Sequence, residues 1–167
     1  MLREFSVFQI GDKIIYGENG VYIVDKIDKL DISGSNKDSL YYYLSPMFGS
    51  GACFVPVNSP VFMRTIMDRN EAEQIISKIP DIEPAVCNDT RFNHVDAFYR
   101  ELFKLHCSEV HVAIIKGLYL KINSKKAKST RAEAIMKKAK NLFYGEMMAV
   151  LGYDSDYLDN LILGDIE

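Results

Sequence analysis

Short apolar runs separated by polar turns fill the first sixty residues, a pattern typical of β-strands. The predicted strands are residues 12–16, 21–27, 40–44 and 52–57, all containing β-branched or aromatic residues. Asn19 and Gly20 lie between the first two strands and favour a tight hairpin turn. Pro56 marks the end or the edge of the last strand. Because five or so short strands cannot form two packed sheets, we expect them to close into a small barrel.

The rest of the chain has apolar residues at helical spacing. Helices are predicted at residues 71–79, 92–106, 109–122, 130–151 and 155–162. The residues predicted to cap or end them are Asn70, Thr130, Gly152, and Asp154 or Ser155. Thr130 and Glu133 are predicted to form a capping box, in which each side chain accepts a hydrogen bond from an unpaired backbone N–H group.

This order of elements, strands first and helices after, implies two segregated modules. It argues against a parallel α/β sheet and against a nucleotide-binding crossover fold. We therefore predict the α+β class, with a small N-terminal β-barrel in residues 1–67 and an all-α C-terminal domain in residues 68–167.

Composition excludes several classes of protein. The 167 residues are 48% hydrophobic and 26% charged, which is an ordinary globular balance. Three cysteines, Cys53, Cys87 and Cys107, provide no paired framework and favour a reducing compartment. The N-terminus lacks the apolar core of a signal peptide, and no stretch approaches the roughly 18 apolar residues of a membrane span. We therefore expect a soluble cytoplasmic protein with no membrane partner.

The net charge of −3 conceals an uneven distribution. Residues 116–140 hold nine basic residues and one acidic residue, Glu133, whereas residues 141–167 hold six acidic residues and no basic one. The nine basic residues are Lys116, Lys121, Lys125, Lys126, Lys128, Arg131, Lys137, Lys138 and Lys140. Such a cluster attracts a phosphate backbone by releasing counterions. Charge alone favours equally a polyanion-binding surface and a solvated helix face balanced by the acidic tail.

No catalytic motif of the forms GxxxxGK[ST], GxSxG or HExxH occurs, and we expect no enzyme activity. The thiol and imidazole side chains that come closest to a metal-binding set are Cys87, His94, His106, Cys107 and His111. A zinc site needs two close ligand pairs, whereas only His106 and His111 form one. Buried cysteines and helix-end histidines are therefore favoured over a metal site, and no cofactor is predicted.

The strand at 40–44 carries three consecutive tyrosines. Strand alternation places Tyr41 and Tyr43 on one face and Tyr42 on the other. A core with one exposed ring is the favoured interpretation. The alternative is an aromatic surface that binds peptides or bases.

Several segments carry a family resemblance. They are GDKIIYGENGVYIV, YYYL, ACFVPV and VFMRTIM in the first half, and IIKGLYLKINSKKAKS and AIMKKAKNLFYGEMMAVLG in the second. The matching positions in the first half are Gly11, Asp12, Tyr16, Gly20, Val21, Tyr42, Pro56, Val57 and Arg64. In these residues the chain resembles the CarD/CdnL family of bacterial transcription regulators over nearly its whole length.

The resemblance implies an SH3/Tudor-like barrel that docks on the RNA polymerase β subunit, and a helical domain that contacts promoter DNA near the upstream edge of the bubble. Docking in the family adds a polymerase strand to an edge of the barrel. The matching strand here is residues 52–55. The polymerase-binding residues implied by the resemblance are Ala52, Cys53, Phe54 and Val55, with Lys29 and Arg64.

Two features depart from the family pattern. Many members carry a Trp that wedges into the minor groove, whereas this chain has no Trp and offers Val86 or Phe92 near the equivalent position, beside Arg91. Several members carry an Arg in the docking strand where this chain has Phe54, and their other docking arginine falls near Lys29. Contact with the polymerase is therefore expected to be less electrostatic, or to use another face.

These inferences predict a non-enzymatic transcription regulator that binds the polymerase and, without base specificity, promoter DNA. It would act by differential affinity for the open complex, as a cytoplasmic protein associated with the nucleoid. The alternative is a protein-interaction adaptor in which the basic segment only solvates a helix or pairs with the acidic tail. The sequence leaves open the direction of regulation, the target promoters and the oligomeric state.

Overall fold

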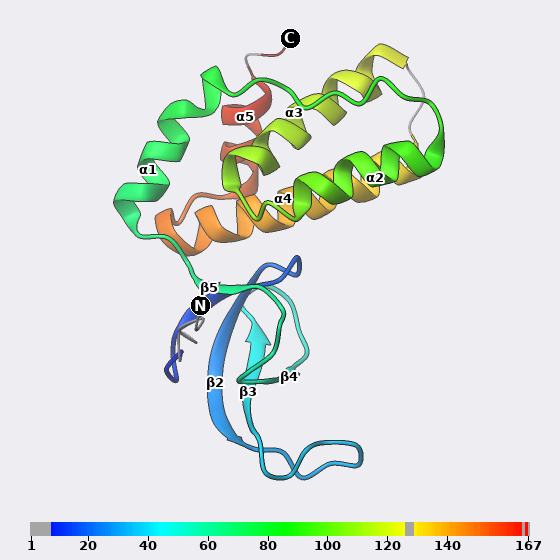
Figure 1. Ribbon diagram of the computed structural model, residues 1–167. Helices are drawn as coiled ribbons and strands as arrows, with labels where there is room; N and C mark the ends of the chain where they lie inside the picture. The colour runs from blue at the N-terminus through cyan, green and yellow to red at the C-terminus, as the bar shows by residue number, and fades with distance from the viewer. Residues whose placement is uncertain (1–7, 126–128, 165, 167) are drawn as a thin grey trace, which may run out of the picture. The chain divides into compact units, whose positions relative to one another are not determined.

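The computed structural model describes residues 8–125, 129–164 and 166 of the chain (Figure 1). The chain divides into two compact units, Met1–Ile66 and Met67–Glu167. In the described residues, the first unit contains the strands and the second contains the helices. The predicted α+β class, with strands followed by helices, is confirmed.

The first unit is an antiparallel sheet. Its strands are β1 (Lys13–Tyr16), β2 (Val21–Lys29), β3 (Leu40–Pro46), β4 (Cys53–Pro56) and β5 (Met63–Thr65), in the spatial order β4-β3-β2-β1-β5. The predicted closure into a barrel is wrong, because β4 and β5 do not pair with each other within the described residues. These two strands are only four and three residues long. Short edge strands expose little unpaired backbone, so the sheet does not need to close.

The hairpin predicted between the first two strands is confirmed. Ile15 of β1 lies opposite Val21 of β2, and the Tyr16 N–H donates to the Gly20 carbonyl at 3.0 Å. Gly20 has a φ of 104°, which a residue with a Cβ rarely adopts. Gly17, with a φ of 53°, takes the other left-handed position, so two glycines close this turn and not both residues of the Asn-Gly pair.

The three tyrosines of β3 have different environments. Tyr42 lies in the small core of the sheet, and its hydroxyl accepts a hydrogen bond from the Phe8 N–H at 3.2 Å. Tyr41 is also buried, whereas Tyr43 is partly exposed and donates its hydroxyl to the Lys29 carbonyl at 3.0 Å. The strand thus contributes two buried rings and one accessible ring.

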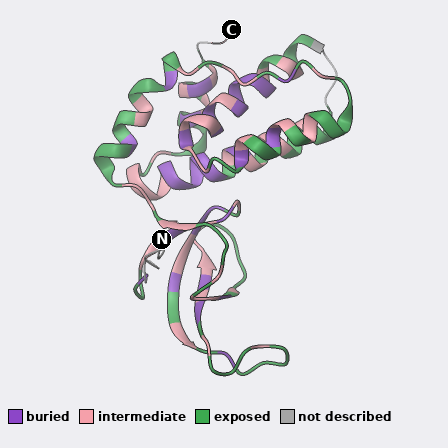
Figure 2. Ribbon diagram, in the orientation of Figure 1, coloured by how far each residue is buried: buried purple, intermediate pink, exposed green. Residues whose placement is uncertain are grey.

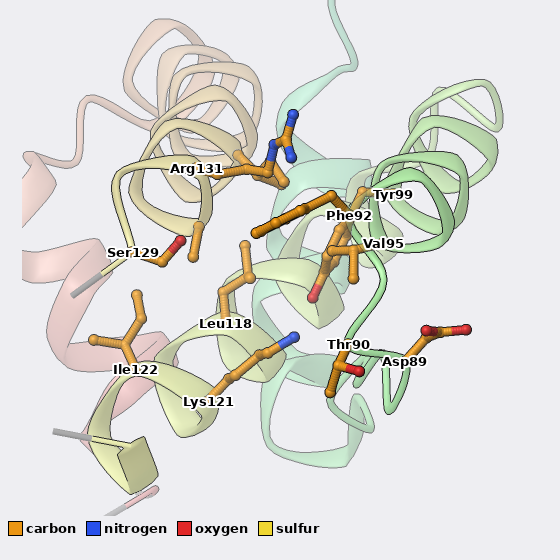
Figure 3. Close-up of a pocket in the computed structure, with 12 residues that line it drawn as sticks. Asp89, Thr90, Phe92, Val95, Tyr99, Leu118, Lys121, Ile122, Ser129 and Arg131 are labelled. Atoms are coloured by element: carbon orange, nitrogen blue, oxygen red, sulfur yellow. The ribbon is translucent and has the colours of Figure 1, made fainter. Parts of the chain in front are cut away.

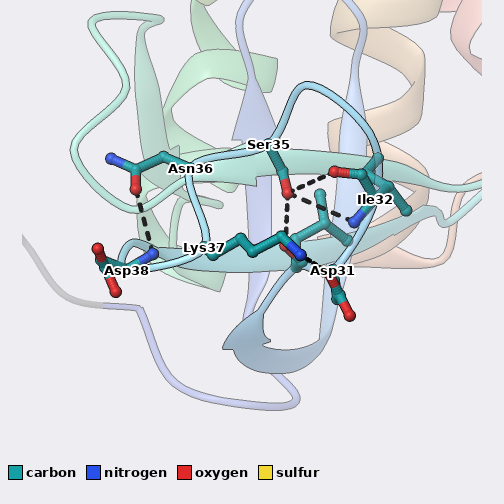
Figure 4. A network of polar contacts seen from close by, with 7 residues as sticks. Asp31, Ile32, Ser35, Asn36, Lys37 and Asp38 are labelled. Carbon is teal, nitrogen blue, oxygen red and sulfur yellow. Dashed lines mark hydrogen bonds and ion pairs between the residues drawn. The ribbon is translucent and has the colours of Figure 1, made fainter.

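The connection between β2 and β3 is ordered by short polar contacts (Figure 4). The Ser35 hydroxyl lies 2.9 Å from the Ile32 carbonyl, and the Asp38 N–H donates to the Asn36 side-chain oxygen at 3.1 Å. Lys37 forms an exposed ion pair of 2.7 Å with Asp31. These bonds satisfy polar groups of the loop that follows the buried Leu30.

The second unit is helical. Its elements are α1 (Arg69–Lys78), the short 3-10 helix η1 (Ile79–Asp81), α2 (Phe92–Phe103), α3 (Ser108–Lys125), α4 (Thr130–Leu151) and α5 (Ser155–Leu163). Each predicted helix is present. The ends predicted at Gly152, which has a φ of 73°, and at Asp154, which accepts from the Tyr157 N–H at 2.8 Å, are confirmed.

Two predicted helix caps are wrong. α1 is capped by Asp68 and not by Asn70, because Asp68 and Glu71 form a reciprocal capping box. Ser129, not Thr130, occupies the N-cap position of α4, and its side chain makes no cap bond. Glu133 is therefore one position too late in the helix to complete a box.

Buried side chains of this unit gather where α3, α4 and α5 face one another (Figure 2). The central ones include Ile115 and Leu118 of α3, Phe143 and Met147 of α4, and Leu158 of α5. None of the helices in the described part of the chain is long and apolar enough to cross a membrane. The described residues also contain no cluster of three His, Cys, Asp or Glu side chains placed to hold a metal ion.

Candidate functional sites on the sheet edge and the helices

β4 has a free backbone edge, since β3 is the only strand that pairs with it in the described sheet. The Val57 N–H donates to the Leu40 carbonyl at 3.0 Å. Hydrogen-bonded and non-bonded pairs alternate along an antiparallel ladder, so the N–H and C=O of Phe54 point away from β3. Pro56 occupies the next outward position, where its missing N–H costs no ladder bond. A further strand would therefore bond to the backbone of Phe54.

An aromatic row crosses the outer face next to this edge. Lys26 of β2 lies opposite Tyr43 of β3, which lies opposite Phe54 of β4. The ring centroids of Tyr43 and Phe54 are 4.9 Å apart with planes at 75°, and the Lys26 Nζ is 5.4 Å from the Tyr43 centroid. Phe54 remains 44% exposed. We name Lys26, Tyr43 and Phe54 the edge row; it offers apolar and cation–π contact to an added strand.

The charge of the edge row is largely balanced. Lys26 Nζ lies 2.6 Å from a carboxylate oxygen of Asp28. This hydrogen bond lowers the pKa of Asp28 and raises the pKa of Lys26, so both groups are charged at neutral pH. Net charge would therefore add little to the affinity of a partner that binds here. This agrees with the expectation, drawn from Phe54 in place of an Arg, that contact with the polymerase is less electrostatic.

The structure brings together most, but not all, of the residues that the resemblance implies for polymerase docking. Ala52 and Phe54 are exposed, whereas Cys53 is partly buried and Val55 packs in the core. Burial raises the pKa of the Cys53 thiol. Lys29 ends β2, where its carbonyl accepts from Tyr43.

Arg64 lies elsewhere, in β5 at the opposite edge of the sheet, where it bonds the Thr65 carbonyl at 3.0 Å. Arg64 is therefore not beside the docking strand, and its contact with the polymerase stays a prediction. The sequence motif that contains Arg64 does not indicate the order of the strands in the sheet.

Lys116 does not belong to a basic surface. It is only 6% exposed, and its Nζ donates to the carbonyls of Ile79 at 2.6 Å and Ile82 at 3.0 Å. The predicted DNA contact is wrong for this residue, because its ammonium group donates to backbone carbonyls within η1 and directly after it. The apolar run that surrounds Lys116 in the sequence is the signal of this burial.

Lys116→Met should destabilise the protein by about 2 kcal/mol, because it leaves two carbonyls without their charged donor. The free energy of unfolding can be measured by urea denaturation followed by circular dichroism. Lys137→Met, at an exposed position of α4, is the matched control and should change it by less than about 0.5 kcal/mol. Equal stability of the two variants would show that the Lys116 bonds contribute nothing.

Three other predicted basic residues are paired with carboxylates. The ion pairs are Arg91–Asp89 at 2.7 Å, Arg131–Asp96 at 3.0 Å and Lys140–Asp159 at 2.6 Å. Asp159 also accepts the Tyr144 hydroxyl at 2.5 Å. Burial, and then Asp159, raise the pKa of Tyr144, while hydrogen bonds from Arg91 hold the pKa of Asp89 far below its usual range. Each pair reduces the positive field that a phosphate would meet.

The remaining basic residues are divided between two helices. Lys137 is exposed on α4, and the Lys138 Nζ lies 4.4 Å above the Phe103 ring. Lys121 lies on α3, with its Nζ 3.4 Å from the Cys87 carbonyl. Lys125 is the last residue of α3 and not part of the predicted loop. Lys126 and Lys128 lie outside the described residues.

Of the two candidate wedge residues, Phe92 is the more prominent. It is the first residue of α2 and is 71% exposed, whereas Val86 lies in the preceding linker and is 46% exposed. The Arg131 guanidinium of α4 lies 5.4 Å from the centroid of the Phe92 ring. The structure thus combines a protruding ring and a cation at one place.

Comparison with known proteins identifies the sheet unit. Residues 8–67 match the family model of the CarD-like/TRCF RID domain. RID denotes an RNA polymerase interaction domain, a protein-interaction module and not an enzymatic family. The resemblance seen in the sequence is confirmed for this part of the chain. No curated protein matches the chain.

Proposed function

We propose that the CarD-like RID domain of this chain docks on the β subunit of RNA polymerase by taking up a polymerase strand at β4. The observation that carries this proposal is the outward-pointing backbone of Phe54 beside the edge row. Strand addition obtains affinity from backbone hydrogen bonds and selectivity from neighbouring side chains. The SH3/Tudor-like character implied by the resemblance would then lie in the bent sheet and its edge, without a closed barrel.

The second part of the proposal is that the helical unit contacts promoter DNA and stabilises the open complex. Its support is the protruding Phe92 with Arg131 beside it, together with the lysines of α3 and α4. An apolar wedge separates stacked bases, and nearby cations hold the adjoining phosphates, for which Arg131 would have to give up its ion pair with Asp96. The regulator would favour promoter opening by binding the open complex more tightly than the duplex.

Phe92→Ala should shorten the lifetime of the open complex by about tenfold and reduce duplex affinity less, because wedging acts only where base steps are unstacked. The lifetime can be followed as decay of promoter complexes after addition of a competitor. Phe92→Trp restores the residue that many family members carry and should retain at least the parental lifetime. Val86→Ala is the comparison; a larger loss there would make Val86 the wedge. Equal losses of lifetime and duplex affinity for Phe92→Ala would favour plain backbone contact.

The alternative function is an adaptor that binds the polymerase without binding DNA. Two observations favour it: the ion pair between Lys140 and Asp159 of the acidic tail, and the burial of Lys116. In this case the basic residues of segment 116–140 stabilise the helices and bind no DNA phosphate. Measurement of DNA affinity against salt concentration separates the two functions, because only phosphate contacts give a steep dependence.

A further inference from the structure

A pocket of about 190 Å³ lies in the helical unit, bounded by α2, α3 and α4 (Figure 3). Its apolar walls include Val95, Leu118 and Ile135, one from each helix. For comparison, a dry engineered cavity of about 150 Å³ binds benzene. The pocket therefore has room for a molecule with a single ring.

Tyr99 supplies an unsatisfied polar group in this pocket. Its side chain is 2% exposed, and its hydroxyl has no hydrogen-bond partner of regular geometry in the described part of the chain. Burial and then the nearby Cys87 thiol raise the pKa of Tyr99 to about 12, against a smaller lowering by a contact with the Cys87 backbone, so the hydroxyl is protonated at neutral pH. A buried hydroxyl with no hydrogen bond of regular geometry is costly, and a polar atom of an occupant would satisfy it better than the weak contact with the Cys87 backbone does.

Among the described side chains that line the pocket, Lys121 is the charged group without an ion pair. Lys121 lines the pocket, and its Nζ has no carboxylate within 4.0 Å in the described residues; its one recorded bond is the 3.4 Å contact to the Cys87 carbonyl. The other charged lining residues in the described part of the chain, Asp89 and Arg131, are held in the ion pairs Arg91–Asp89 and Arg131–Asp96. A ligand with a single negative charge would therefore be neutralised by Lys121.

We propose that this pocket binds a small hydroxylated aromatic monocarboxylate. The ring would pack between Val95, Leu118 and Ile135, the carboxylate would pair with Lys121, and the hydroxyl would bond Tyr99. Charge-assisted hydrogen bonds of this kind are stronger than those between neutral groups. Phe92 and Arg131 also line the pocket, so an occupant would alter the surface proposed to contact DNA. That consequence rests on the proposed function, whereas binding of the ligand does not.

The probe for this proposal is 4-hydroxybenzoate, added to the full chain while methyl NMR signals of Val95, Leu118 and Ile135 are followed. Saturable shifts of these signals are expected at probe concentrations below about 10 mM, a range suited to ligands of this size. Phenol, which lacks the carboxylate, should bind about tenfold more weakly. Benzoate, which lacks the hydroxyl, should bind about threefold to tenfold more weakly.

Four variants test where the probe binds. Lys121→Met should weaken 4-hydroxybenzoate by about tenfold and leave phenol unchanged. Tyr99→Phe should remove the advantage of 4-hydroxybenzoate over benzoate, and Ala132→Leu should fill the pocket and abolish binding of both. Lys137→Met, on α4 but outside the pocket, should bind as the parent does. Absence of saturable shifts in the parent protein, or shifts that persist in both Ala132→Leu and Lys121→Met, would overturn the proposal.

Discussion

Phe54→Glu is expected to weaken binding to the polymerase β subunit by about a hundredfold, since central aromatic residues carry much of an interface's energy. The substitution removes the ring that lies 4.9 Å from Tyr43 and places a carboxylate beside the backbone that an incoming strand must approach. Charges on edge strands oppose strand addition, because pairing would strip water from the charge. The fold should survive, since Phe54 is half exposed and is not part of the sheet's core cluster.

The matched control is Thr65→Glu, the same new charge on β5 at the opposite edge of the sheet. It should leave polymerase affinity within about threefold of the parent, as expected for a residue outside the interface. Affinity can be measured with a purified fragment of the β subunit, and far-ultraviolet circular dichroism checks the fold of each variant. If Phe54→Glu keeps both its circular dichroism and its affinity, the docking surface lies elsewhere, and a loss confined to Thr65→Glu would place it at β5.

Several helix and turn boundaries could be predicted because their causes are local, although the caps predicted at Asn70 and Thr130 were one or two residues out. The turn at residues 17–20 needs the left-handed conformation of Gly20, and Gly152 and Asp154 end and begin helices through their own backbone or side-chain geometry. Barrel closure depends instead on whether two distant edge strands meet. Composition and strand number do not determine this, and the short strands β4 and β5 do not pair with each other in the described residues.

The edge row could not be predicted, because it depends on an irregularity in β2. Simple alternation would place Lys26 on the same face as buried Val24. A register shift between these two residues makes Val24 face Leu44 and Lys26 face Tyr43 instead. The extra residue in the strand moves Lys26 to the outer face, as β-bulges do. A bulge leaves no clear mark in a single sequence. The alignment of Lys26 with Tyr43 and Phe54 therefore could not be predicted.

Charge counting failed for a similar reason. The net charge of residues 116–140 is the same whether a lysine side chain contacts water, a carboxylate or a buried carbonyl. Lys116 and Lys140 show two of these outcomes, with Nζ bound to the Ile79 carbonyl and to Asp159, respectively. The partners are 37 and 19 residues away, so only the packing of the helices determines the pairs. The structure thus reduces the candidate phosphate contacts without removing them.

Replacing Lys125, Lys137 and Lys138 together by Glu is expected to lower the affinity for promoter DNA by about a hundredfold at moderate salt. Each lost phosphate contact should reduce the slope of log affinity against log salt by about one unit, alike for all DNA sequences. Polymerase docking should be unchanged, because the docking edge belongs to the other unit.

The control for this variant changes the same amount of charge elsewhere in the helical unit. Arg69, Lys78 and Lys104 are exposed on or next to α1 and α2, and their replacement by Glu alters the net charge equally. If DNA affinity depends on contacts made by the basic segment, this control should keep most of its salt slope. If both triple variants lose affinity equally, binding follows net charge and has no defined surface. If the first variant binds DNA with the parental affinity and slope, the basic segment is a solvated helix face, and the adaptor function replaces the DNA-binding one.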